Sequence, residues 1–151
     1  MAAPINREMV LARISDMEAQ LAALRGQAAL PDGAFLGDPK EIKSARYSLI
    51  VLVEAAAAIC GHVVARLLRQ AVDAYPECFA ALAAHGLLDP DLARRLSAMA
   101  RFRNILVHGY GRVDDRHLLA MLRTDLVDVD RYVEAIRTLV AGSAGRETEP
   151  S

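Results

Sequence analysis

The sequence predicts an all-α protein, a helical bundle of about five helices, on three observations. More than half of the 151 residues (54%) are hydrophobic, but only 5% are aromatic and none is tryptophan. Much of the hydrophobic content is alanine and leucine, which favour helix. Apolar residues recur every three or four positions, and β-branched runs of period two are absent. A chain of this length can bury one substantial core, so we expect a single domain over residues 1–141 and a flexible polar tail over residues 142–151.

Apolar periodicity and capping residues predict the first two helices. The first runs from Asn6 to Ala28, with a narrow apolar seam spaced alternately by four and three residues. The Pro31-Asp32-Gly33 sequence ends it, and we expect a short loop to follow. The second helix starts at Asp38-Pro39, where aspartate is a capping residue and proline suits the first helical position. Its apolar stripe continues to about Val72.

Three further helices are predicted in the second half of the chain. A short one spans Pro76 to His85 and is closed by a glycine. The next opens at Asp89-Pro90 and stops just after His108, where two glycines follow within three residues. The last runs from Asp114 to about Val140 with a clean apolar face. Short connections of this kind are typical of helical bundles.

The charge is unevenly distributed along the chain. The formal net charge is −1 and the isoelectric point is near 6.4, so bulk charge does not indicate nucleic-acid binding. The segment from Arg94 to Arg123, however, contains seven arginines and only two aspartates. Its net charge is therefore +5, and that of the rest of the chain is −6. This segment fits either a solvated helix face or a surface that binds an anionic partner.

The two cysteines and the apolar segments bear on the location of the protein. Cys60 and Cys78 lack metal-ligand spacing, so we expect buried free thiols. The N-terminus lacks the basic-then-apolar layout of a signal peptide. The most apolar stretch, Leu49–Leu68, is interrupted by a glutamate, a histidine and an arginine, so we expect no membrane span. The sequence therefore predicts a cytoplasmic protein.

The main candidate site lies at the end of the fourth predicted helix. Arg103, Asn104, His108 and Tyr110 form the string R-N-x-x-x-H-x-Y, with Arg101 close before it. Arginine can hold a phosphate with forked hydrogen bonds, and histidine can move a proton near neutral pH. Metal-free RNA cleavage needs these two functions, and Asn104 can orient either the histidine or the phosphate.

Helical geometry places limits on this motif. Asn104 and His108 share a face, whereas Arg103 and His108 are about 140° apart around an ideal helix. One histidine cannot easily be both acid and base, so a symmetric dimer with two facing motifs is attractive. Two other interpretations stay open: His108 can act as a favourable cation at a helix C-terminus, and Tyr110 can pack in the turn.

The stretch Arg103–Tyr110 resembles the signature of the HepT-like toxins of the HEPN superfamily. The resemblance covers about Lys40 to Val140 and includes Arg46-Tyr47 with Glu54, and Tyr75-Pro76. It implies an all-α homodimer whose two R-x-x-x-x-H motifs line a cleft between subunits. It implies metal-independent cleavage of RNA (tRNA or mRNA) with Arg103 and His108 as the active residues, and it implies no cofactor.

The resemblance also implies a partner and a modification. The expected partner is a nucleotidyltransferase antitoxin similar to the MntA proteins, which can transfer AMP to Tyr110. One departure concerns the second helix, where the family often has an acidic residue one turn after Glu54 and this chain has Ala58. Glu54 can either replace that acid or pair with an arginine. The departure motivates an alternative, a non-catalytic module that docks and regulates a nucleotidyltransferase.

Overall fold

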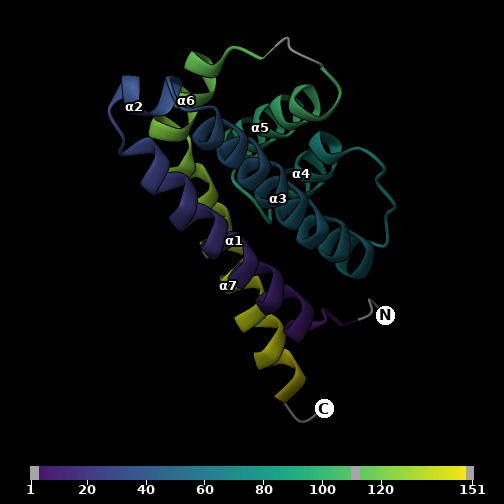
Figure 1. The fold of residues 1–151 in the computed structure, drawn as a ribbon. Coiled ribbons are helices and arrows are strands. Elements are labelled where there is room, and N and C mark those ends of the chain that lie inside the picture. The colour runs from purple at the N-terminus through teal and green to yellow at the C-terminus, as the bar shows by residue number, and fades with distance from the viewer. Residues whose placement is uncertain (1–3, 110–112, 149–151) are drawn as a thin grey trace.

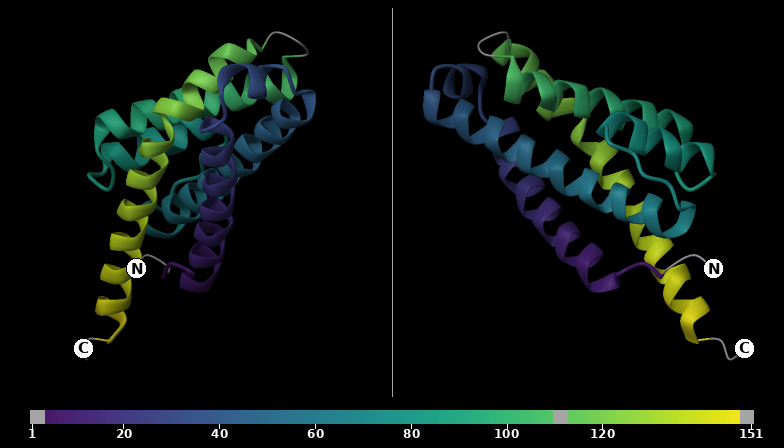
Figure 2. Two further views of the ribbon diagram at one scale, coloured as in Figure 1. Left: turned by 60° about the vertical axis from the view of Figure 1, so that its left-hand side comes forward. Right: turned by 90° about the vertical axis from the view of Figure 1, so that its right-hand side faces the viewer.

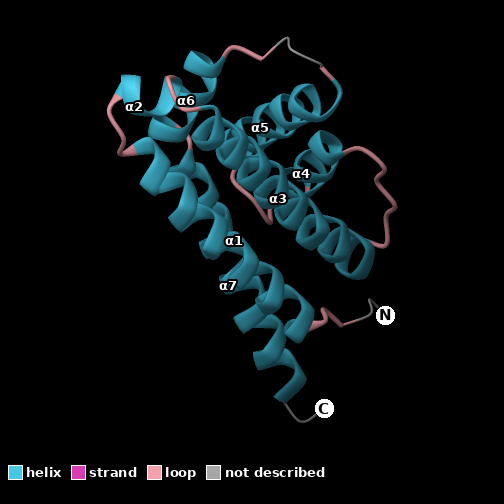
Figure 3. Cartoon of the chain, in the orientation of Figure 1, coloured by secondary structure: helices cyan, strands magenta, loops and turns pink. Residues whose placement is uncertain are grey.

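The computed structural model describes residues 4–109 and 113–148 of the chain. These residues form seven α-helices and one turn of π-helix, and the described residues contain no strand. The elements in chain order are α1 (Arg7–Ala28), α2 (Asp32–Leu36), α3 (Pro39–Val63), the π-helical turn η1 (Val64–Leu68), α4 (Tyr75–Ala84), α5 (Pro90–His108), α6 (Asp115–Thr124) and α7 (Leu126–Thr148). The all-α prediction is therefore confirmed, as Figure 3 shows.

The helices pack as a bundle around α3. Helix α1 lies along α3, and α4 lies beside α5 (Figure 1). Helix α7 passes beside α1 and contacts α5 and α6, and its C-terminal end projects beyond the other helices (Figure 2). Two ion pairs join α1 to α7, Arg25 with Asp130 and Glu18 with Arg137. This arrangement holds the two long outer helices together on one side of the molecule.

The predicted starts of three helices are confirmed by their capping contacts. The Asn6 side chain accepts a hydrogen bond from the Met9 amide at the start of α1. Asp38 accepts from the Lys40 amide at the start of α3, and Asp89 accepts from the Leu92 amide at the start of α5. Aspartate and asparagine stabilise helix N-termini because they satisfy amides that have no partner within the helix.

Two predicted boundaries in the first half of the chain are wrong. The segment after Pro31 is not a loop but the short helix α2, which buries Phe35 completely. The α-helical part of the second predicted helix ends at Val63 rather than near Val72, and the chain leaves it through η1 and Arg69, whose φ is 53°. Neither glycine nor proline stands between His62 and Tyr75, so nothing in the sequence marks this end.

The last predicted helix is also wrong in two respects. It is divided at Asp125 into α6 and α7. The Thr124 hydroxyl lies 2.9 Å from the Asp125 carboxylate and 3.0 Å from the Ala120 carbonyl oxygen, which are local contacts that compete with helix continuation. Helix α7 then continues to Thr148, past the expected end near Val140. Isolated glycines such as Gly142 cost a helix only about 1 kcal/mol each, so they do not end it.

The core is aliphatic with a few aromatic anchors. Tyr132 is fully buried, donates its hydroxyl hydrogen bond to the Ala56 carbonyl oxygen at 2.8 Å and meets Phe79 edge-on. Burial raises the pKa of this phenol well above its usual value. Cys60 and Cys78 are buried free thiols, as predicted, and the neighbouring Cys78 together with burial raises the pKa of Cys60.

By length and composition alone, the helix over Pro39–Leu68 is long and apolar enough to cross a membrane. Of its most apolar stretch, 61% is buried among the other helices. The apolar side chains of this helix therefore serve as the centre of the core.

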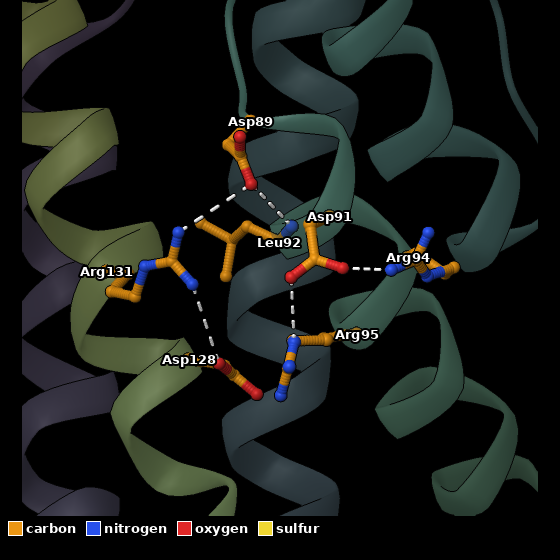
Figure 4. Close-up of polar contacts among 7 residues, drawn as sticks. All are labelled: Asp89, Asp91, Leu92, Arg94, Arg95, Asp128 and Arg131. Carbon is orange, nitrogen blue, oxygen red and sulfur yellow. Dashed lines mark hydrogen bonds and ion pairs between the residues drawn. The ribbon is translucent and has the colours of Figure 1, made fainter.

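Charged residues at the start of α5 connect it to α7 (Figure 4). Asp91 pairs with Arg94 and, at 3.1 Å, with Arg95 on its own helix. Arg131 of α7 lies 3.7 Å from Asp89 and 3.9 Å from Asp128. Burial raises the pKa of Asp128, which is 4% exposed. This network fixes the N-terminal end of α5, the helix that carries the candidate site.

Candidate functional site

Helix α5 positions the residues of the candidate site near its C-terminal end. The capped start of α5 at Asp89 and its buried apolar face against the core set its rotation. Gly109 follows the last helical residue, and its amide bonds to the Ile105 carbonyl oxygen at 2.7 Å. A Cβ atom at Gly109 would collide with that same oxygen, so glycine permits the close turn directly after His108.

The Arg103 side chain is held by three neighbours. Its Nη2 atom donates to Glu54 Oε1 of α3 at 2.5 Å, and its Nη1 atom donates to Asn104 Oδ1 at 3.0 Å. The guanidinium also lies over the ring of Tyr75, the first residue of α4, at 5.2 Å from the ring centre. With these contacts the side chain is only 14% exposed. A charged, partly desolvated group with a fixed orientation is suited to receive a phosphate.

His108 lies on a different side of α5 from Arg103. It is exposed, as are Arg101 and Asn104, and these three residues share one face of the helix. Within the described part of the chain, Arg103 and His108 form no hydrogen bond with one another. The structure therefore brings together Arg103, Asn104 and Glu54, and it leaves His108 and Arg101 on the solvent side of the same helix.

Glu54 forms an ion pair with Arg103, the predicted catalytic arginine. Of the two interpretations of Glu54, the structure therefore agrees with the one in which it pairs with an arginine. A hollow of about 230 Å³ adjoins the contact and is lined by Glu54, Ala58 and Tyr75 together with Arg13 and Asp16 of α1. Ala58 thus borders a hollow that already contains two carboxylates, those of Asp16 and Glu54. Arg13 and Asp16 lie 3.9 Å apart, so the hollow has mixed charge.

Tyr75 was not among the predicted site residues, and the sequence signal for it is weak. A tyrosine directly before a proline at a helix start is equally typical of a packing residue at the rim of a core. Its role as a surface for the Arg103 guanidinium depends on the turn between η1 and α4, which the sequence does not predict. His62, by contrast, is not one of the three neighbours that hold Arg103, and it accepts a hydrogen bond from the Asn6 amide at 2.8 Å.

The start of α6, which follows the candidate site in the chain, is held by its own cap and by an ion pair with α3. Asp114 caps α6 by accepting from the Arg116 amide at 2.9 Å, and Asp115 pairs with Arg46 of α3 at 2.5 Å. His117 packs edge-on against Phe102 of α5, with ring centres 5.2 Å apart. Tyr110, the predicted modification site, lies outside the described residues. Gly109, before it, is bonded to Ile105 of α5, and Asp115, further along the chain, is paired with α3.

Comparison with protein families gives one match that covers most of the chain. The model of the HepT-like family, described as ribonuclease HepT-like, matches residues 17–136. No match was found among the curated proteins.

Several solved structures share the fold. A toxin–antitoxin crystal structure with AMP-PNP aligns with a TM-score of 0.79 and 19% identity, over 87% of this chain and 98% of its own. The tri-AMPylated HEPN toxin of Shewanella oneidensis, in complex with its MNT antitoxin, aligns with a TM-score of 0.80 and 21% identity, over 86% and 97%. The cytosolic protein YutE from Bacillus subtilis, of unknown function, aligns with a TM-score of 0.80 and 14% identity, over 100% and 98%. At these identities the likeness establishes the fold.

Proposed function

The chain belongs to the ribonuclease HepT-like family, and from this premise we propose that it is the toxin of a toxin–antitoxin system that cleaves RNA. The observation that carries the proposal is the fixed Arg103, whose guanidinium is oriented by Glu54 and Tyr75 on the helix that also presents His108. A preorganised positive group is the type of feature that stabilises charge developing on a phosphate in a transition state.

The two residues have separate roles in the proposed cleavage. The 2′-oxygen of the RNA attacks the adjacent phosphorus, and the 5′-oxygen of the next nucleotide leaves. His108 transfers a proton, either from the attacking hydroxyl or to the leaving oxygen. Arg103 stabilises the negative charge on the phosphate oxygens, and Asn104, which accepts a hydrogen bond from Arg103, helps to orient it. The reaction assigned to these residues requires no metal ion or cofactor.

We propose that the active form is a symmetric homodimer. One face of α3 carries Tyr47, Ile50, Val51 and Ala58, and Tyr47 is 67% exposed. Ile50, Val51 and Ala58 are partly exposed, and an apolar stripe of this kind can serve as an interaction surface. A second copy on this stripe would lie next to Glu54 and the Arg103 contact. Two His108 residues would then be available, one as base and one as acid. The dimer is tested by light scattering: Tyr47→Glu should yield a monomer, and an unchanged mass would contradict this interface.

A nucleotidyltransferase antitoxin is the proposed partner. The solved complexes with the same fold are described as toxin–antitoxin pairs, and one of their toxins is AMPylated. Transfer of AMP to Tyr110 would place a phosphate close to His108 in the sequence, where it opposes an incoming RNA backbone. The test is intact-mass analysis after incubation with the cognate nucleotidyltransferase and ATP. Addition of AMP that survives Tyr110→Phe would contradict the assignment.

Growth inhibition in cells tests the toxin proposal. Expression of the wild-type chain should arrest growth, and co-expression of the nucleotidyltransferase should restore it. Arg103→Ala and His108→Ala should each be harmless at equal protein levels and with unchanged circular dichroism. Toxicity that persists in both variants would contradict the proposal.

A non-catalytic module that docks and regulates a nucleotidyltransferase is the second candidate. Two observations favour it: Ala58 stands where the family often has an acid, and Arg103 and His108 lie on different sides of one helix. This candidate predicts that the purified chain binds the nucleotidyltransferase but cleaves no RNA in any oligomeric state. RNA cleavage that depends on His108 would exclude it.

A further inference from the structure

An open groove of about 520 Å³ lies between α4 and α5, and none of the proposed catalytic steps uses it. Alanine side chains contribute to its lining, among them Ala80 and Ala83 of α4 and Ala93 of α5. Arg94 and Arg101 of α5 also line it. The groove thus combines an apolar lining with guanidinium groups, and its volume is in the range of small-ligand pockets.

The groove has two arginines in its lining, of which Arg101 is the one open to an anionic partner. Glu77 is the one acidic residue in its described lining. Arg94 is already paired with Asp91 on the same helix (Figure 4). Arg101 is exposed and forms no ion pair among the residues that the structure describes. Its guanidinium is therefore available for an anionic group.

Helical geometry connects the groove to the candidate active site. Arg94, Arg101 and His108 follow one another at intervals of seven residues, close to two full turns, so they share one face of α5. Asn104 is exposed on the same face between Arg101 and His108. The distance from Arg101 to His108 along the helix axis is about 10 Å at 1.5 Å per residue. A chain bound in the groove can therefore continue along α5 to His108.

We propose that this groove is a binding subsite for single-stranded RNA that flanks the cleaved bond. Arg101 binds a backbone phosphate, and the alanine lining receives the apolar face of an unpaired base or its ribose. A duplex keeps its base faces stacked, so only an unpaired segment can use this lining. The inference rests on the proposed function, because it takes RNA as the substrate of the neighbouring site.

The test measures binding of a fluorescein-labelled single-stranded RNA to the full chain carrying His108→Ala, which prevents cleavage during the measurement. Arg101→Gln removes the proposed phosphate contact, and Ala80→Phe fills the groove without a change in charge. Arg7→Gln and Ala19→Phe are matched controls at exposed positions of α1. We expect both groove variants to weaken binding by roughly fivefold or more at 0.1 M salt. Arg101→Gln should also lower the slope of log K against log salt by about 0.7.

The outcomes separate this inference from the proposed function. Groove variants that bind RNA as tightly as their controls, in a protein whose wild type cleaves RNA, would overturn the subsite and leave the function standing. Groove-dependent binding by a wild type that never cleaves RNA would support the subsite and contradict the proposed function. Groove variants that keep RNA binding but lose the nucleotidyltransferase would assign the groove to the protein partner and overturn the inference. Equal weakening for duplex RNA would contradict its preference for a single strand.

Discussion

The guanidinium of Arg103 lies between the carboxylate of Glu54 and the ring of Tyr75. The Glu54 contact measures 2.5 Å, and the centre of the Tyr75 ring lies 5.2 Å from the guanidinium carbon. Three helices thus meet at one side chain, because Glu54 belongs to α3, Tyr75 to α4 and Arg103 to α5. The orientation of this arginine is consequently a property of the whole bundle.

Removal of the Glu54 carboxylate should release Arg103 and slow RNA cleavage. We expect Glu54→Ala to lower kcat by roughly tenfold or more, since misplacement of a positioned group by about 1 Å can cost up to 100-fold. Glu54→Gln keeps a hydrogen-bond acceptor at the same place and should retain more activity. The measurement is the initial rate of cleavage of a labelled RNA.

Asp16→Asn is the matched control, because Asp16 lines the same hollow but is not a partner of Arg103. Equal losses for Asp16→Asn and Glu54→Ala would show that the charge of the hollow matters, in contradiction to the positioning role of Glu54.

The Tyr75 ring should matter through its aromatic face. Tyr75→Phe keeps the face and should behave like the wild type in kcat. Tyr75→Leu keeps the apolar bulk but loses the attraction for the guanidinium, which is worth about 0.5–1 kcal/mol at partly exposed sites. We expect kcat of Tyr75→Leu to fall by a few fold with little change in thermal unfolding. An equal loss in Tyr75→Phe would instead indicate a role for the hydroxyl group.

His62 should make the stability of the fold dependent on pH. Burial, and then the nearby Arg66, lower the pKa of His62 from its usual value of 6.5, and its Nε2 atom accepts from the Asn6 amide. Protonation is thus favoured in the unfolded chain, so the free energy of unfolding should fall as the pH drops below about 6.5. Denaturant unfolding at pH 7.5 and pH 5.5 measures this difference.

His62→Gln, which keeps a hydrogen-bond acceptor without titrating, should reduce the difference between the two pH values. His85→Gln is the control, because it replaces an exposed histidine at the end of α4. If His62→Gln shows the same difference in the free energy of unfolding between the two pH values as the wild type, the pH dependence arises from another residue.

Two glycine substitutions should have opposite effects. Gly109→Ala introduces a Cβ that collides with the Ile105 carbonyl oxygen, and we expect a loss of about 1–3 kcal/mol in stability together with reduced cleavage. Gly26 lies within α1, and an added Cβ there would meet open space, so Gly26→Ala should stabilise the protein by about 0.4–1 kcal/mol. Thermal unfolding of both variants gives the comparison, and a neutral Gly109→Ala would contradict the close turn after His108.

Much of the fold is encoded in local signals that a sequence displays. Asn6, Asp38 and Asp89 each mark a helix start because capping depends on a side chain and the next few amides. The end of α3 could not be predicted in this way. The left-handed backbone conformation in the turn after α3 is adopted by Arg69 and not by a glycine, so the sequence does not indicate it. The turn depends on how α4 packs against the rest of the bundle.

In the candidate site, too, the features that depend on local spacing could be predicted and those that depend on tertiary packing could not. The spacing of Arg103 and His108 already predicts that they lie on different sides of one helix, and the structure places them so. The contact of Arg103 with Glu54 joins residues 49 positions apart, and the contact with Tyr75 requires the turn before α4. Such contacts depend on tertiary packing, so the sequence left two interpretations open for Glu54 and did not indicate Tyr75 as a site residue.

The central claim is that Arg103 and His108 cleave RNA, and the most direct measurement is the cleavage rate of a purified, dimeric protein on a labelled single-stranded RNA. We expect His108→Ala and Arg103→Ala each to lower the rate by about 100-fold or more while His85→Ala cleaves like the wild type. Cleavage by His108→Ala at the wild-type rate, or no cleavage by the wild-type protein, would contradict the claim.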